Sequence, residues 1–133
     1  MISGLLQGHV EEVFFEVSEE KLRLSAAQMT NYRNLYDRFG NPSPQTIRTH
    51  FRRLGVPDIL AGLSWQARAT ESVVRALEHL NNLRNQIAHG AVHLRLAGQP
   101  YSLRTHDAEV FRNFAENFGA RFTLHVRRLL SLP

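Results

Sequence analysis

Apolar residues recur at steps of three and four positions along most of this chain, a spacing that places them on one face of a helix. The first such run covers residues 2–17, and its stripe consists of Leu5, Leu6, His9, Val10, Val13 and Phe14. A second helix is predicted over residues 25–39, with Met29, Tyr32, Leu35, Tyr36 and Phe39 along one side. The segment 40–44 contains glycine and two prolines and therefore ends this helix.

A short third helix is predicted directly after this break. The hydroxyl of Ser43 can cap its N-terminus, and Pro44 suits the first helical position, where no amide donor is needed. Its inward face consists of Ile47, Phe51 and Leu54, and Gly55 ends it. Residues 56–60 are predicted to turn into a short helical piece that Trp65 closes.

The most regular pattern covers residues 70–90. Thr70 is the predicted N-cap and Gly90 the predicted stop. The inward positions of this helix are Val73, Leu77, Leu80, Leu83 or Arg84, and Ile87. Residues 91–97 alternate briefly, which fits either a strand or an extended loop, and residues 98–100 predict a turn.

A long closing helix is predicted over residues 105–130, with Arg127 and Arg128 near its negative end. Its stripe of Val110, Phe111, Phe114, Phe118, Phe122 and Val126 indicates core or dimer packing rather than a cofactor site. Together the elements predict an all-α protein, an antiparallel helical bundle of four main helices plus short helical pieces. At 133 residues we expect a single domain over 1–133, either free-standing or cut from a longer protein.

Composition narrows the function classes. The chain has no cysteine, which excludes disulfides, thiolate metal sites and cysteine nucleophiles, and which suits a reducing compartment. No apolar run approaches the ~20 residues that a membrane span needs. The N-terminus lacks the basic region and the apolar stretch of a signal peptide. We therefore expect a cytoplasmic protein without a membrane partner.

The formal charge is +4, an excess that permits a polyanionic partner without requiring one. Lys21 is the only lysine among the 16 basic residues, so the positive charge is almost all guanidinium. Guanidinium groups pair bidentately with phosphate, which fits RNA. A GC-rich genome, which favours arginine codons, would also explain why arginine is so much more frequent than lysine.

Several chemistries find no support in the sequence. It has no glycine-rich phosphate loop, no HExxH motif and no nucleophile elbow. His89 and His93 have the spacing of metal ligands on a helix, but Gly90 lies between them and ends the helix, so we expect neither a metal nor a cofactor. Glu11 and Glu12 are adjacent and point about 100° apart on a helix, so they do not form an acid–base pair.

The remaining candidate pair is Arg84 with His89, at the end of the most regular predicted helix. No other histidine has an arginine five to seven residues upstream. On an ideal helix the two side chains point about 140° apart and lie about 7.5 Å apart along the axis. They converge only if the last turn loosens at residues 88–90, or if a second copy of the helix supplies the missing half across a dimer axis.

Such a pair suits RNA cleavage. A histidine of near-neutral pKa can accept the proton of the 2′-hydroxyl, which then attacks the adjacent phosphorus. A guanidinium stabilises the dianionic transition state without a metal. The expected products carry a 2′,3′-cyclic phosphate and a 5′-hydroxyl. A histidine in the last turn of a helix is, however, favourable to the helix dipole on its own.

The letters around this pair resemble the signature of HEPN domains, an arginine and a histidine in the form RN-x-x-A-H-G, here residues 84–90. The similarity is greatest to the RiboL-PSP branch, in which a proline-bounded segment like residues 41–47, followed by one like 51–55, precedes the signature helix. The resemblance implies a helical homodimer and a metal-independent endoribonuclease, as in toxin–antitoxin and phage-defence systems. It assigns His89 as general acid and base, Arg84 as phosphate ligand and Asn85 as the polar neighbour that shapes the site. A carboxylate of the first helix sometimes assists, either Glu12 or Glu11. An antitoxin or a fused regulatory domain is a further expected partner.

Two alternatives stay open. Some HEPN-like domains are inactive and serve as dimerisation, partner-binding or nucleotide-binding modules, in which case His89 would be structural. Alternatively, the short helix after Pro44 carries Arg48, Arg52 and Arg53 and would bind DNA as part of a helix-turn-helix, with residues 55–58 as the turn.

Overall fold

The computed structural model describes residues 2–36, 40–65, 68–88, 90, 93–96, 98–101 and 105–133. These residues form five α-helices and one β-hairpin, and the fold is mainly helical, as predicted. The elements in chain order are α1 (Ile2–Leu22), α2 (Ala26–Leu35), α3 (Pro44–Arg52), α4 (Thr70–Ala88), β1 (Leu94–Leu96), β2 (Gln99–Tyr101) and α5 (Thr105–Leu129). None of the helices in these ranges is both long and apolar enough to cross a membrane.

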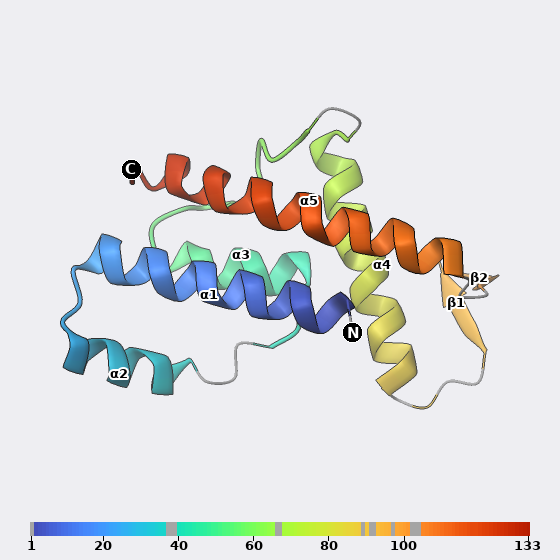
Figure 1. The fold of residues 1–133 in the computed structure, drawn as a ribbon, viewed down its shortest axis with the longest axis horizontal. Helices are drawn as coiled ribbons and strands as arrows, with labels where there is room; N and C mark the ends of the chain where they lie inside the picture. The colour runs from blue at the N-terminus through green and yellow to red at the C-terminus, as the bar shows by residue number, and fades with distance from the viewer. Residues whose placement is uncertain are drawn as a thin grey trace.

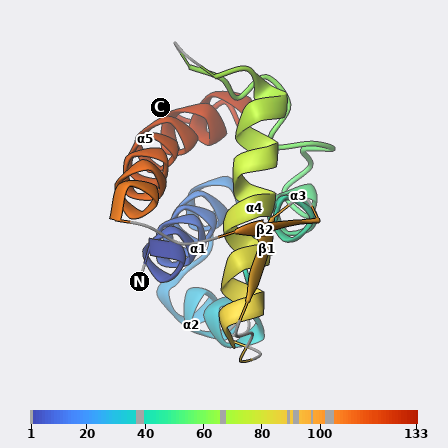
Figure 2. The same ribbon diagram turned by 90° about the vertical axis from the view of Figure 1, so that its right-hand side faces the viewer.

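The helices are arranged around a side-by-side pair, α1 and α5, which α4 crosses steeply (Figures 1 and 2). Helix α2 folds back beside α1, and the hairpin lies at the end where α5 begins (Figure 1). Contacts between α1 and α5 advance together along both helices, which therefore run in the same direction. These contacts are His9 with Gly119, Glu16 with Arg127, and Lys21 with Leu130.

The parallel direction of α1 and α5 corrects the predicted antiparallel bundle. Antiparallel neighbours follow from short connections, because a short loop returns the chain along the helix it has just left. Such a connection joins α1 to α2, which are antiparallel. The 82 residues between Leu22 and Thr105 join α1 to α5, so no short loop sets their relative direction.

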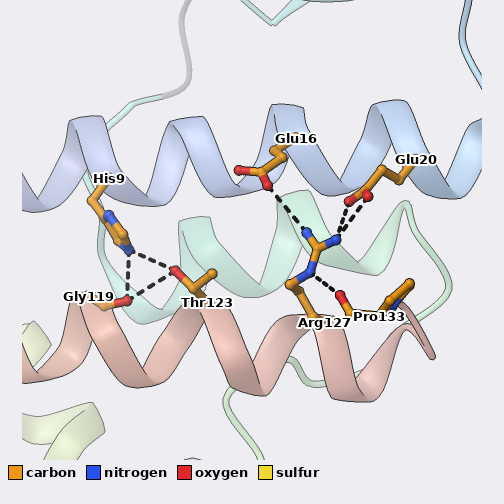
Figure 3. Close-up of polar contacts among 7 residues, drawn as sticks. All are labelled: His9, Glu16, Glu20, Gly119, Thr123, Arg127 and Pro133. Carbon is orange, nitrogen blue, oxygen red and sulfur yellow. Dashed lines mark hydrogen bonds and ion pairs between the residues drawn. The ribbon is translucent and has the colours of Figure 1, made fainter.

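Polar side chains line the seam between α1 and α5 (Figure 3). The guanidinium of Arg127 donates to Glu16 at 3.3 Å and pairs with Glu20 at 2.7 Å. At the C-terminal ends of the two helices, the Lys21 ammonium donates to the backbone carbonyl of Leu130 at 3.2 Å. The seam thus fixes the register of two helices that are far apart in the sequence.

One continuous apolar core draws on all five helices. It includes stripe residues of α1, α4 and α5 together with Met29 of α2, Ile47 and Phe51 of α3, and the loop residues Ile59 and Leu60. Its largest fully buried side chains are Phe14, Phe51, Phe118 and Phe122. The rings of Phe51 and Phe122 meet edge to face at 5.5 Å, a favourable aromatic geometry that joins α3 to α5.

Local signals account for the starts of α2 and α3, whereas Thr70, the predicted N-cap of α4, is its first helical residue, and the carbonyl of Ala69 accepts from the amide of Val73. Ser25 caps α2 in a capping box, in which its hydroxyl accepts from the amide of Gln28 and the Gln28 side chain accepts from the amide of Ser25. Ser43 caps α3 by accepting from the amide of Thr46 at 3.2 Å, and Pro44 takes the first helical position as predicted.

Other local predictions are corrected. Residues 56–64 form turns instead of the expected short helix, and the amide of Trp65 then donates to the carbonyl of Arg68 in an isolated bridge. The next helix begins only at Thr70, so α3 has no tightly linked partner and the helix-turn-helix alternative lacks its second helix. The predicted turn at 98–100 is confined to Gly98, because Gln99 and Pro100 belong to β2.

The ends of two predicted stripes lie outside the core. Ile87 is 44% exposed near the end of α4, and Val110 is 39% exposed near the start of α5. Helix α2 ends at Leu35, and Phe39, predicted for its apolar side, lies outside the described residues. These predicted apolar faces are therefore longer than the parts of the helices that are buried in the bundle.

Candidate functional site

Arg84 lies in the last two turns of α4, beside the apolar stripe. Leu80 and Leu83 point into the bundle and are buried, and Arg84 is half-buried next to them. Its Nη1 donates to the side-chain oxygen of Gln7 in α1 at 2.8 Å. This bond crosses the bundle between residues 77 positions apart and holds the guanidinium against the first helix.

The charge of Arg84 is not neutralised by any carboxylate in the described ranges. Ion pairs there engage Arg33, Arg48 and Arg127, and the polar contact of Arg84 is to the neutral amide of Gln7. Holding a cation half-buried without a counter-charge is costly, and an arriving anion relieves that cost. Arg84 is therefore suited to bind an anion.

Asn85 follows Arg84 in α4, but it contacts the segment before α3 and not α1. Its Oδ1 accepts from the side-chain amide of Asn41 at 3.0 Å. Asn41 precedes α3 and belongs to the proline-bounded segment 41–47. The contact thus joins this segment to the end of α4, although the sequence assigned Asn41 no role.

A cavity of about 490 Å³ opens between α3 and α4, beside Asn85. Its lining consists of Ser43, Pro44, Glu78, Asn81, Asn82, Asn85 and Gln86. The Oδ1 of Asn81 is buried there without a hydrogen-bond partner in the described part of the chain. Four of the lining residues, Asn81, Asn82, Asn85 and Gln86, carry side-chain amides.

His89, the predicted general acid and base, lies outside the described residues. Helix α4 is regular through Ala88, and Gly90 then adopts a φ of +73° with its amide bonded to the carbonyl of Ile87 at 3.1 Å. The predicted helix stop at Gly90 is confirmed, because this left-handed conformation is the one that glycine adopts without strain. The convergence of His89 with Arg84 stays a prediction.

The two carboxylates considered for α1 occupy different faces. Glu12 pairs with Arg33 of α2 at 3.3 Å and keeps 68% of its side chain exposed. Glu11 lies one turn after Gln7 on α1, and the charged groups that act on it are Glu12 and Arg33. Burial raises the pKa of Glu11, repulsion from Glu12 raises it further, and Arg33 opposes both.

Gln7 is the residue that sequence reasoning missed at this site. It lies beside the apolar stripe between Leu6 and Val10, so periodicity gives only the weak signal of a polar residue at the edge of the buried face. Its partner is fixed by tertiary packing alone. The contacts bring Gln7, rather than Glu12, to Arg84.

The β-hairpin is attached directly to α4. The side-chain amide of Gln86 donates to the carbonyl of Arg95 and accepts from its amide, both at 2.7 Å. Gln86 therefore pairs with β1 much as a neighbouring strand would. His93, the second histidine of the rejected metal pair, is exposed just before this strand. Within the described ranges no group of three or more His, Asp or Glu side chains is arranged to hold a metal ion.

Comparison with protein-family models, with curated proteins and with solved structures finds no match to this chain. The features of the chain that bear on function are Arg84 held by Gln7, Asn85 held by Asn41, and the cavity beside them.

Proposed function

We propose that this chain is a HEPN-type endoribonuclease that cleaves RNA without a metal ion. The observation that carries the proposal is Arg84, a half-buried guanidinium at the end of the signature helix, held by Gln7 and without a carboxylate partner among the described residues. A fixed, uncompensated cation of this kind is what a pentacoordinate phosphorane transition state requires. Arg84 is therefore assigned to the scissile phosphate.

The reaction needs one proton acceptor and one fixed cation. His89 takes the proton from the 2′-hydroxyl, the 2′-oxygen attacks the phosphorus, and the bond to the 5′-oxygen breaks. The leaving 5′-oxygen receives a proton from an imidazolium, supplied by His89 or by its copy in a second subunit. The products are a 2′,3′-cyclic phosphate and a 5′-hydroxyl, so all atoms are accounted for without an added oxidant or metal.

Asn85 and the cavity beside it support RNA as the substrate. Asn41 restrains the Asn85 side chain, so its amide can contact RNA with little loss of rotamer entropy. The amides that line the α3–α4 cavity are groups that hydrogen-bond to the edges of unstacked bases. We assign the four main helices of the HEPN pattern to α1, α2, α4 and α5, with α3 as the short proline-bounded helix.

The proposed active form is a homodimer. On an ideal helix Arg84 and His89 would point about 140° apart, and α4 is regular through Ala88. A two-fold axis at this end of α4 would place Arg84 of one protomer near His89 of its partner. As a biological setting we propose a toxin or phage-defence effector, restrained by an antitoxin or by a fused regulatory domain.

The test is cleavage of single-stranded RNA in EDTA, with analysis of the product ends. The parent protein should leave cyclic phosphates, and His89→Ala and Arg84→Ala should each lose at least a hundredfold in rate. His93→Ala and Arg112→Ala remove the same residue types at exposed positions and should cut like the parent. Thermal melting shows that each variant is folded.

Two results would reject the proposal. If His89→Ala and Arg84→Ala cut as fast as the controls, the site is wrongly assigned. If the folded parent cuts no RNA and His89→Ala lowers its dimer affinity in sedimentation, the chain is a binding module and not a nuclease.

A further inference from the structure

A second groove lies between the N-terminal half of α4 and helix α5. Its larger part, about 690 Å³, and an adjoining part of about 180 Å³ share Arg68, Ser72, Val110 and Phe114, so the two are continuous. We call this feature the α4–α5 groove. It is separate from the α3–α4 cavity, with which it shares no lining residue.

The α4–α5 groove is strongly cationic. Its described lining includes the side chains of Arg68, Arg75, His79 and Arg121 and no carboxylate. None of these three arginines forms an ion pair with an acidic residue in the described ranges, although three other arginines of the chain do. Their charge is therefore available to a ligand, and the groove is complementary to a polyanion.

Flat apolar surface lies among these cations. The guanidinium of Arg68 lies 5.0 Å from the ring centre of Phe114, and it donates to the hydroxyl of Ser72 at 3.1 Å. The ring of Trp65 is half-buried, 5.9 Å from the same phenylalanine. Val110, 39% exposed, continues the apolar floor. Guanidinium planes and partly exposed aromatic rings are surfaces on which unpaired bases stack.

We propose that the α4–α5 groove binds a single strand of RNA, with phosphates on Arg75 and Arg121 and a base on the Arg68–Trp65 surface. The choice of RNA over other polyanions rests on the proposed function, since the same strand would continue to Arg84 along α4. A double helix presents stacked bases that cannot reach these surfaces, which favours a single strand. The groove would thus hold the substrate away from the cleavage point.

The experiment measures binding of a fluorescent 2′-O-methyl RNA 12-mer to the full chain by anisotropy. This oligonucleotide lacks the attacking hydroxyl, so binding is observed without cleavage. Loss of one phosphate contact should weaken binding about fourfold at about 0.15 M salt and reduce the slope of log K against log salt by about 0.7. Arg75→Gln and Arg121→Gln should each show this effect, and together about fifteenfold.

Arg112→Gln is the matched control. Arg112 is also an exposed arginine of α5, but it lies about 160° around the helix from Phe114 and outside the groove lining. It should lower affinity less than twofold, which separates groove contact from net charge. If all three variants weaken binding equally, or if the parent does not bind the 12-mer, the groove proposal is overturned.

Two further outcomes separate the proposals. If the parent binds the 12-mer through the groove but cleaves no RNA, the nuclease proposal is overturned and the groove proposal stands. Cleavage that needs Arg84, with Arg75→Gln and Arg121→Gln binding like the control, overturns the groove alone. A polyglutamate peptide that displaces the 12-mer at equal concentration would show an acidic peptide site, and it would also overturn the choice of RNA.

Discussion

Replacing Gln7 by alanine tests whether the bond across the bundle positions Arg84 for catalysis. In the structure the oxygen of Gln7 accepts from the Nη1 of Arg84 at 2.8 Å, and the described residues offer Arg84 no carboxylate as a substitute. Gln7→Ala leaves the guanidinium in place but free to rotate. Arg84 would then still carry its charge without a fixed direction.

The magnitude follows from the exposure of the pair. A hydrogen bond to a charged group contributes about 1.5–3 kcal/mol when fully buried. Both side chains are only partly buried, and water can replace the lost acceptor, so we expect about 1 kcal/mol of folding free energy. If a similar loss, about 1.4 kcal/mol, applies to the transition state, the cleavage rate falls about tenfold. Because orientation is lost rather than charge, kcat should fall more than KM rises.

The assay combines urea unfolding with single-turnover cleavage of RNA at a temperature where every variant is folded. Gln28→Ala is the matched control, because it removes a glutamine from the capping box of α2 at a similar cost of about 1 kcal/mol without touching Arg84. Gln28→Ala should therefore cut RNA at the parent rate. Equal slowing of both variants would refute the positioning role, since stability alone would then explain the loss.

Three further predictions concern the fold. Burial lowers the pKa of His125 below its usual 6.5, so the folded state favours the neutral ring and the free energy of unfolding should fall as pH drops below about 6.5. Urea unfolding at about pH 7.5 and about pH 5.5 measures this fall, which should be smaller in His125→Gln. Gln86→Ala loses both bonds to the Arg95 backbone, so the amide of Arg95 should exchange with solvent roughly fivefold faster by NMR; unchanged exchange would mean that the hairpin is held by other contacts. Phe122→Ala empties a fully buried position and should cost about 3–5 kcal/mol in urea unfolding, whereas Leu124→Ala, at a position 64% exposed, should cost about 0.5 kcal/mol or less.

The helices could be predicted because their signals are local. The hydroxyl of Ser43 and the ring of Pro44 act within one turn of the helix they start, and the stop at Gly90 depends on its own backbone. The direction of α5 relative to α1 could not be predicted, because it depends on packing across 82 intervening residues. Residues 56–64 supply buried side chains such as Ile59 to the core without a helix, so apolar content there did not distinguish turn from helix.

The candidate site was predictable only along α4. Arg84 and Asn85 are adjacent in the sequence and carry the resemblance. Their partners Gln7 and Asn41 come from distant segments, 77 and 44 residues away, and carry no pattern that names a partner. The cationic side chains of the α4–α5 groove are likewise spread over α4, α5 and the segment before α4, and only tertiary packing brings them together.

The parallel direction of α1 and α5 also has an electrostatic consequence. Two helices that run the same way bring their C-terminal partial negative charges to one end of the molecule, where these repel each other. Lys21 of α1 donates to the carbonyl of Leu130, just past α5, and Arg127 of α5 reaches the carboxylates of α1 (Figure 3). Each helix thus supplies a cation at the end where both dipoles are negative. Fraying of either helix C-terminus removes a cation that interacts with the other helix, so the two helix ends should loosen together. Added salt screens the attraction between these cations and their partners and should make this loosening easier.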